Sequence, residues 1–128
     1  MKLGDSMAQK QDFPVVFERL KCILQAHSAN LTIQTDEPGS YYLNAPYSAR
    51  YKKDLFFGAA LVKKNYVSFY LMAVYMFPDL LDGMSDTLKK RMQGKSCFNF
   101  TSIDEETLNE LSSLTEKSMD RFRQEQLV

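Results

Sequence analysis

Tyrosine is the residue type whose placement most suggests chemistry in this 128-residue chain. All seven tyrosines fall in one central stretch, at Tyr41, Tyr42, Tyr47, Tyr51, Tyr66, Tyr70 and Tyr75. Tyr66, Ser68 and Tyr70 alternate with apolar residues, so a strand here would place all three on one face. Such amphipathic rings can bind a small ligand, a partner protein or a second copy of the chain. The alternative is that they only fill a half-buried sheet face, where tyrosine has high propensity.

Basic side chains interleave with these tyrosines, and the candidate binding site therefore comprises Tyr42, Arg50, Tyr66, Ser68 and Tyr70. Aromatic rings beside cations are also how a sheet holds single-stranded nucleic acid. Two observations weigh against nucleic acid as a partner. The 16 Lys and Arg residues are balanced by 16 Asp and Glu residues, and no RNP-like motif is present.

Side chains suited to catalysis are few. The single histidine, His27, extends the apolar stripe of a predicted helix, which favours a core-edge position over a general base. No nucleophile elbow, Walker loop, Rossmann glycine pattern or His-Glu metal motif occurs, so we predict a non-catalytic protein without a cofactor. The two cysteines, Cys22 and Cys97, are too few for a zinc finger, and we expect reduced thiols in the cytoplasm.

Three charged clusters each have a structural explanation, and two of them also have a functional alternative. Residues 89–91 lie near a predicted helix end, where cations complement the helix dipole, and with Lys95 they are alternatively an anion site. Residues 104–106 begin the last predicted helix, where acidic side chains are favourable. Three aspartates have a spacing that could offer oxygen ligands to a hard cation, or simply solvate a helix surface: Asp79, Asp82 and Asp86.

Hydrophobic spacing predicts the elements that position these residues. Asp12 is a suitable N-cap for a first helix with Pro14 in its first turn, and this helix ends by residue 30. Strands are predicted at 31–35, 40–44, 55–62, 66–72 and 96–100. A turn is expected at 36–39 and a loop at 45–54, because Pro46 interrupts the strand pattern. Two short helices follow at 77–84 and 85–92, the second capped by Ser85 and stopped by Gly94.

The final helix has the clearest signature. A capping box at 102–105 precedes an apolar face formed by Leu108, Leu111, Leu114, Met119 and Phe122. Strands and helices are segregated along the chain, which predicts a single compact α+β domain over 12–128, a mainly antiparallel sheet with helices packed on one face. A flexible tail is expected over 1–11. No apolar run approaches the ~20 residues of a spanning helix, and no signal-peptide pattern is present, so we expect a cytoplasmic protein without a membrane partner.

Four segments resemble, in the same order, the YdhG-like family of small bacterial domains of unknown function. They are NAPY at 44–47, FFGA at 56–59, KNYVSFY at 64–70 and GKSCFNF at 94–100. The resemblance runs from residue 44 to 122 and implies a compact α+β domain similar to the frataxin-like arrangement. One branch of the family is linked to intracellular iron delivery, which is the alternative function. Frataxin-like iron binding relies on an acidic ridge over the first helix, where this chain has Glu18 beside Arg19 and Lys21.

Overall fold

The computed structural model describes residues 5–128, with side chains from residue 12 onward. Its single sheet has five strands in the order β1-β2-β3-β4-β5, and every neighbouring pair is antiparallel. The strands are β1 (Thr32–Glu37), β2 (Ser40–Ser48), β3 (Lys53–Val62), β4 (Val67–Leu71) and β5 (Cys97–Phe100). Because strands adjacent in the sequence are adjacent in the sheet, short turns join β1 to β2 and β3 to β4. Gly39 (φ +78°) supplies the left-handed backbone that the first of these turns needs.

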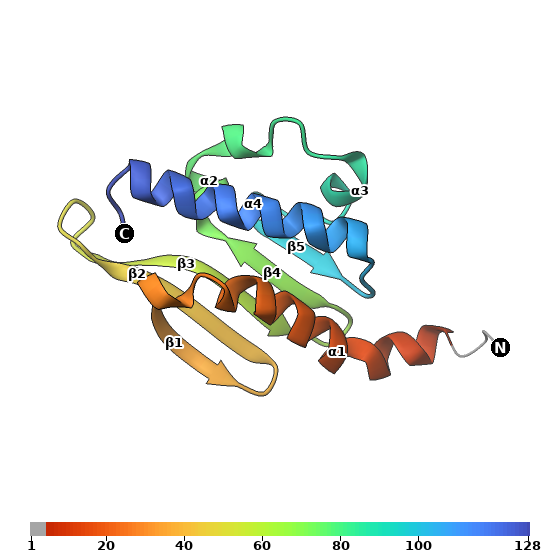
Figure 1. The fold of residues 1–128 in the computed structure, drawn as a ribbon. Helices are drawn as coiled ribbons and strands as arrows, with labels where there is room; N and C mark the ends of the chain where they lie inside the picture. Colours follow the sequence, from red (N-terminus) through yellow and green to blue (C-terminus); the bar gives the residue numbers. More distant parts are fainter. Residues whose placement is uncertain (1–4) are drawn as a thin grey trace.

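Two long helices, α1 (Asp5–Gln25) and α4 (Glu105–Gln124), lie side by side over one face of the sheet (Figure 1). The short helices are the 3₁₀ segment η2 (Ser28–Asn30), α2 (Met72–Met76), the 3₁₀ segment η3 (Pro78–Leu81) and α3 (Asp86–Lys89). The last three of these connect β4 to β5 beside α4. The predicted compact α+β domain is therefore confirmed, with its helices packed on one face of an antiparallel sheet. Within residues 5–128, no helix has the length and hydropathy needed to cross a membrane.

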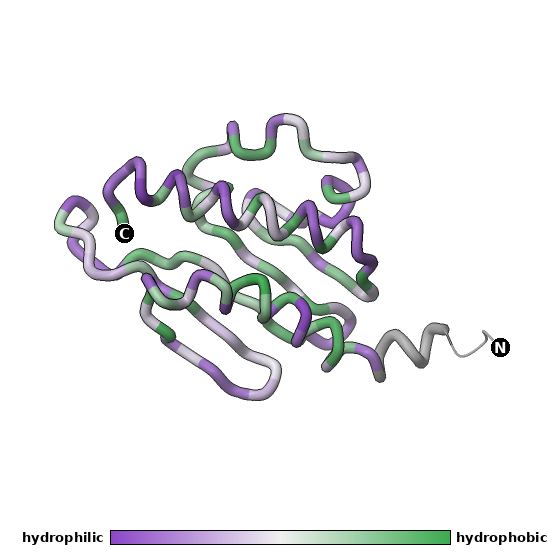
Figure 2. Tube along the Cα trace, viewed as in Figure 1, coloured by the Kyte–Doolittle hydropathy of each residue, from purple (hydrophilic) through white to green (hydrophobic). Residues whose placement is uncertain are grey.

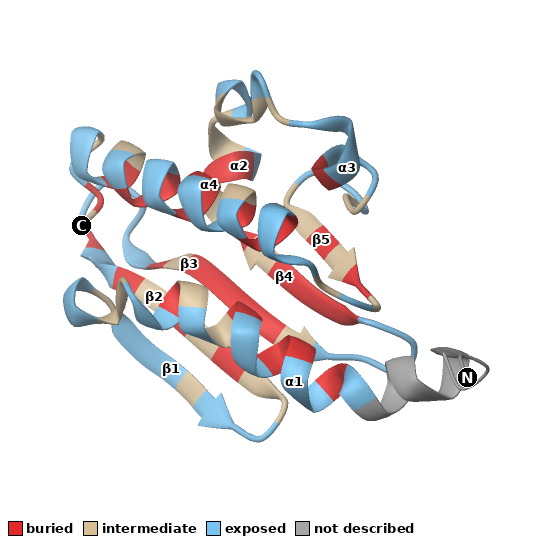
Figure 3. Ribbon diagram, turned by 45° about the vertical axis from the view of Figure 1, so that its right-hand side comes forward, coloured by how far each residue is buried: buried red, intermediate tan, exposed pale blue. Residues whose placement is uncertain are grey.

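One hydrophobic core fills the space between the helices and the sheet. Figure 3 shows its buried residues along β3 and β4 and on the sides of α1 and α4 that face the sheet. The same strands are hydrophobic in Figure 2, whereas the outer turns of α4 are hydrophilic. The predicted apolar face of α4 is confirmed, since all five of its residues are buried.

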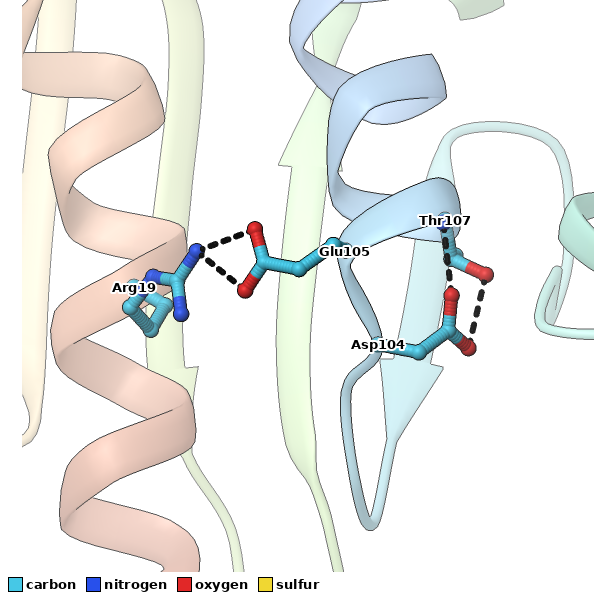
Figure 4. A network of polar contacts seen from close by, with 4 residues as sticks. All are labelled: Arg19, Asp104, Glu105 and Thr107. Atoms are coloured by element: carbon cyan, nitrogen blue, oxygen red, sulfur yellow. Dashed lines mark hydrogen bonds and ion pairs between the residues drawn. The ribbon is translucent and has the colours of Figure 1, made fainter.

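Polar contacts tie the start of α4 to α1 (Figure 4). The Asp104 carboxylate accepts hydrogen bonds from the Thr107 backbone N–H at 2.8 Å and from its hydroxyl at 3.1 Å. These bonds stabilise the ionised form and lower the pKa of Asp104. One guanidinium nitrogen of Arg19 lies 2.9 Å from each oxygen of Glu105. The N-cap is thus Asp104, and the predicted capping box that began at Ser102 is wrong by two residues.

The first helix begins earlier than predicted. It starts at Asp5, so Asp12 lies inside it and is not its N-cap. Residues 5–11, which we expected in the flexible tail, are helical because Ala8, Gln9 and Lys10 are good helix formers. Pro14 then lies inside the helix, where its missing N–H removes one backbone hydrogen bond. The remainder of the predicted tail, residues 1–4, lies outside the described residues.

Two prolines account for the other differences. The predicted loop at 45–54 instead continues β2 to Ser48 and starts β3 at Lys53. Pro46 is tolerated because the register shifts between Asn44 and Tyr47, an irregularity that needs no N–H from it. The helix predicted at 77–84 forms only in part, as the 3₁₀ segment η3 that begins at Pro78. The separate helix α2 ends at Met76, because the residue before a proline is disfavoured in helical geometry.

The second predicted short helix is present but shorter. It forms only α3, and its predicted cap is confirmed, because the Ser85 hydroxyl oxygen accepts from the Leu88 N–H at 3.1 Å. Gly94 does not end this helix. It lies five residues beyond Lys89 with φ +82°, in the turn that leads into β5.

Candidate functional site

The strand register places a set of side chains on the face of the sheet opposite α1 and α4. Directly paired residues of an antiparallel sheet share a face. One row across four strands consists of Tyr42, Ala59, Tyr70 and Cys97. The adjacent row consists of Ser40, Leu61, Ser68 and Asn99. Their strand neighbours, such as Val67 and Phe69, point to the helices and are buried in the core, as the alternation predicts.

A β-bulge in β3 decides which residues join these rows. Leu43 pairs with Gly58, but the next residue, Asn44, pairs with Phe56. Phe57 is therefore an extra residue, and it is fully buried in the core. The bulge reverses the alternation along β3, so Phe56 lies on the same face of the sheet as Ala59 and Leu61. A strict period of two would have placed Phe56 on the opposite face.

The result is a semi-apolar surface that we name the open-face patch, formed by Tyr42, Phe56, Ala59, Leu61 and Tyr70. The rings of Tyr42 and Phe56 lie 5.8 Å apart at a tilt of 51°. Ala59 lies fully buried between the flanking tyrosines, and the four larger residues are half-buried. No helix of the described chain covers this face, since α1 and α4 lie on the other one (Figure 1).

A polar network lies beside the patch. The Ser68 hydroxyl donates to the Asn99 side-chain oxygen at 2.6 Å, and the Cys97 thiol donates to the same oxygen at 3.3 Å. Ser68 retains only 1% of its accessible surface. Ser68, predicted as a binding-site residue, is therefore buried, and its hydroxyl is paired with Asn99. Burial, and secondarily the neighbouring Cys97, raises the pKa of Tyr70, so its phenol is neutral at physiological pH.

Two of the predicted site residues lie outside the two rows. Tyr66 precedes β4, in the turn from β3, where its carbonyl oxygen accepts from the Lys63 N–H at 2.8 Å. Arg50 lies between β2 and β3, with its guanidinium 5.2 Å from the centre of the Tyr51 ring. It also donates to the Glu125 carbonyl oxygen at 3.4 Å. The structure thus groups Tyr42, Ser68 and Tyr70 on one face, while Arg50 engages the C-terminal segment.

The remaining tyrosines do not form one surface. Tyr41 is 1% exposed and faces the core, with the Lys21 ammonium 5.3 Å from its ring centre. Tyr75 lies on α2 and is exposed, so the tyrosines are not confined to the sheet. Sequence reasoning missed Phe56 and Leu61 as members of the patch. The signal available for them was Gly58, because a glycine inside a strand pattern often marks a bulge.

His27 lies at the edge of the core, as predicted. Its ring centre is 6.5 Å from that of Phe57, and burial lowers the pKa of His27. Charged groups on α4 have smaller effects on it: Glu116 and Asp120 raise the pKa, and Arg123 lowers it.

This burial has a consequence for stability. Because the unfolded chain binds a proton at His27 more readily than the folded chain, the free energy of unfolding should fall as pH drops from about 7.5 to 5.5. His27 is the only histidine, so His27→Gln should remove most of this dependence. Denaturant unfolding of both proteins across this pH range measures the effect. An equal pH dependence in the two proteins would contradict the assignment.

Metal-binding geometry is not found in the described part of the chain. Within it, no group of three or more His, Cys, Asp or Glu side chains is placed to hold a metal ion. Asp79, one of the three aspartates considered as cation ligands, forms an ion pair with Arg121. Lys21 of α1 pairs with Asp36 of β1 at 2.9 Å.

The open-face patch offers rings, methyl groups and half-buried hydroxyls without a nucleophile-base pair among them. Its arrangement is suited to recognition, because aromatic residues supply contact area and the phenol groups can hydrogen-bond at the rim. The chain matches no family model, no curated protein and no solved structure.

Proposed function

We propose that this protein is a non-catalytic binding module whose open-face patch docks on a second copy of the chain. The observation that carries the proposal is the uncovered sheet face with half-buried aromatic side chains at its centre. Small-molecule sites are usually concave, whereas the face of a sheet is comparatively flat. A flat surface with an apolar centre and hydroxyl groups fits another protein surface better than an enclosed small ligand.

Charge favours a second copy as the occupant. In a two-fold symmetric interface each group meets groups of the same patch, so a charged centre would repel itself. The two central rows contain no charged residue. Charged side chains on this face come at its margins, where Glu37 pairs with Ser40 and Asp54 pairs with Tyr47. Hydroxyl groups such as that of Tyr70 both donate and accept, so two identical patches can complement each other.

The size of the face predicts a weak dimer. Strands about 4.8 Å apart and about five residues at roughly 3.3 Å each give a face of about 24 by 17 Å. Stable complexes bury about 800 Å² per partner, and this face of about 400 Å² offers roughly half of that, as weak and transient contacts do. We therefore expect an equilibrium between monomer and dimer that depends on concentration.

The cellular setting is part of the same proposal. Cys22 and Cys97 are both free thiols, which suits the reducing cytoplasm. The four sequence segments that resemble the YdhG-like family support membership of that group, and they leave its function open. A cytoplasmic module that self-associates through a sheet face is consistent with both observations.

A charge placed at the centre of the patch tests self-association. Leu61→Glu is expected to weaken the dimer by about 100-fold or more, because like charges opposed in an interface cost several kcal/mol. Val15→Glu is the matched control, since Val15 is 58% exposed on α1. Sedimentation equilibrium over a wide concentration range measures both variants and the parent protein, with thermal unfolding to verify folding. A parent protein that stays monomeric throughout, or a Leu61→Glu variant that associates like the parent, would refute the proposal.

Iron delivery remains the alternative function, and it has an independent test. Titration calorimetry with Fe(II) under oxygen-free conditions measures binding directly. Binding heat that is abolished by a substitution at Glu18 would favour the alternative. If Fe(II) produces neither binding heat nor a shift of the unfolding temperature, the iron-delivery alternative is rejected.

A further inference from the structure

The largest groove near the β4–β5 connection lies outside the open-face patch. It has a volume of about 700 Å³ and is formed by α2, η3 and the turn before β5. Its lining consists of Val74, Tyr75, Met76, Pro78, Leu81, Met92, Gly94 and Lys95. Most of these residues are apolar, and the volume falls within the range of about 300–1,000 Å³ that is usual for small-molecule sites. None of them belongs to the open-face patch, so the groove is a separate candidate site.

Both walls of the groove are held in place by backbone hydrogen bonds. On one side, the Phe77 N–H donates to the Ala73 carbonyl oxygen at 2.7 Å and closes the end of α2. On the other side, the Gln93 N–H donates to the Cys97 carbonyl oxygen at 2.8 Å. The Ser96 carbonyl oxygen in turn accepts from the Leu71 N–H at 3.0 Å, which fastens this turn to β4. The backbone that carries Lys95 is therefore fixed relative to the apolar wall.

The lining has one charge, and that charge is positive. Lys95 is exposed and forms no ion pair among residues 12–128, and no acidic residue lines the groove. Two further exposed lysines, Lys89 and Lys90, precede the same turn on and after α3. Arg91, by contrast, lies over the Phe100 ring with its guanidinium 5.8 Å from the ring centre. The groove thus has one positive charge, that of Lys95, in a lining that is otherwise apolar or uncharged.

We propose that this groove binds a small apolar carboxylate, with its hydrocarbon or ring body against Met76, Leu81 and Met92 and its carboxylate at Lys95. Methionine side chains adapt to irregular apolar ligands, which suits a body of variable shape. A single ammonium is a compact point charge that matches a monoanion, whereas phosphate recognition usually relies on arginine forks or several backbone amides. Tyr75, 56% exposed at the groove, supplies further aromatic contact area.

Decanoate and decanol are suitable probes, since they share an apolar body and differ in charge. Titrations are followed by calorimetry and by NMR of isotope-labelled methionine methyl groups. Decanoate is expected to shift the Met76 and Met92 signals. Lys95→Gln should weaken decanoate binding by about tenfold, because a hydrogen bond to a charged group is lost. Decanol binding should not change in this variant, and Lys64→Gln, an exposed lysine in the turn between β3 and β4, should not affect either probe.

The outcomes separate the proposal from its competitors. Decanoate that fails to bind at millimolar concentration, or that binds the parent and Lys95→Gln equally, overturns it. Decanoate that gives binding heat but leaves the Met76 and Met92 signals unchanged also overturns it, because the ligand then binds outside this groove. Tighter binding of decanoate than of decanol, lost in Lys95→Gln and retained in Lys64→Gln, supports it.

Discussion

Replacing Phe57 by alanine is expected to lower the free energy of unfolding by about 3–5 kcal/mol, the range for deletion of a buried phenylalanine. Phe57 is fully buried, and its ring meets that of Phe122 edge-on, with centres 5.3 Å apart and planes at 85°. This contact joins the bulge in β3 to α4, so the vacated volume would lie between the sheet and its main helix. Urea unfolding of the parent and Phe57→Ala measures the loss.

The neighbouring phenylalanine provides the control. Phe56 is half-buried on the open face, so Phe56→Ala should cost clearly less than Phe57→Ala. The larger loss of stability at Phe57 depends on the bulge, because a regular strand would place Phe56 in the core and Phe57 on the open face. A larger loss for Phe56→Ala than for Phe57→Ala would show that the register of β3 is wrong.

The second large effect is expected at Gly58, where alanine should cost about 1–3 kcal/mol through overpacking. A Cβ atom at this position would lie 2.8 Å from the Tyr70 carbonyl oxygen and 3.0 Å from a methyl group of Leu24. The first of these is a backbone atom in the β3–β4 ladder and cannot move alone. Relief of the contact would therefore separate β3 from β4 or displace α1.

A size series distinguishes this steric effect from the backbone freedom of glycine. The loss of stability should grow from Gly58→Ala to Gly58→Leu, because the larger side chain collides with more of the core. At Gly83, a Cβ atom would meet nothing within 4 Å and only the backbone (φ +80°) is strained. Alanine and leucine should therefore cost similar amounts there. Equal losses for the two substitutions at Gly58 would contradict the close packing of β3 against β4.

The parts of the fold that sequence predicts well have strong local signals. The apolar residues of α4 recur with helical spacing over about four turns. The alternation in β4 places Val67 and Phe69 in the core. Ser85 is recognisable as a cap because its side chain interacts with a residue only three positions away. In each case, the interaction that decides the structure is local in the sequence.

The parts that sequence does not predict depend on contacts between distant segments. The membership of Phe56 and Leu61 in the open-face patch follows from the bulge, which pairing between β2 and β3 creates. Likewise, Pro46 predicts the end of a strand from the sequence alone. The strand continues because its pairing with β3 is irregular between Asn44 and Tyr47. Arg50 is adjacent to tyrosines in the sequence, yet its partner Glu125 lies at the other end of the chain.

The most direct test of the docking proposal is an isotope-filtered NOE measurement on a mixture of labelled and unlabelled protein at high concentration. Two copies joined through the open-face patch should show intermolecular NOEs between the Tyr42 or Tyr70 ring of one copy and the Leu61 methyl groups of the other. All other intermolecular NOEs to the Tyr42 and Tyr70 rings, which do not involve residue 61, should also disappear in Leu61→Glu and should remain in Val15→Glu. Intermolecular NOEs that arise only from the outer surfaces of α1 and α4, or none at all, would contradict the proposal.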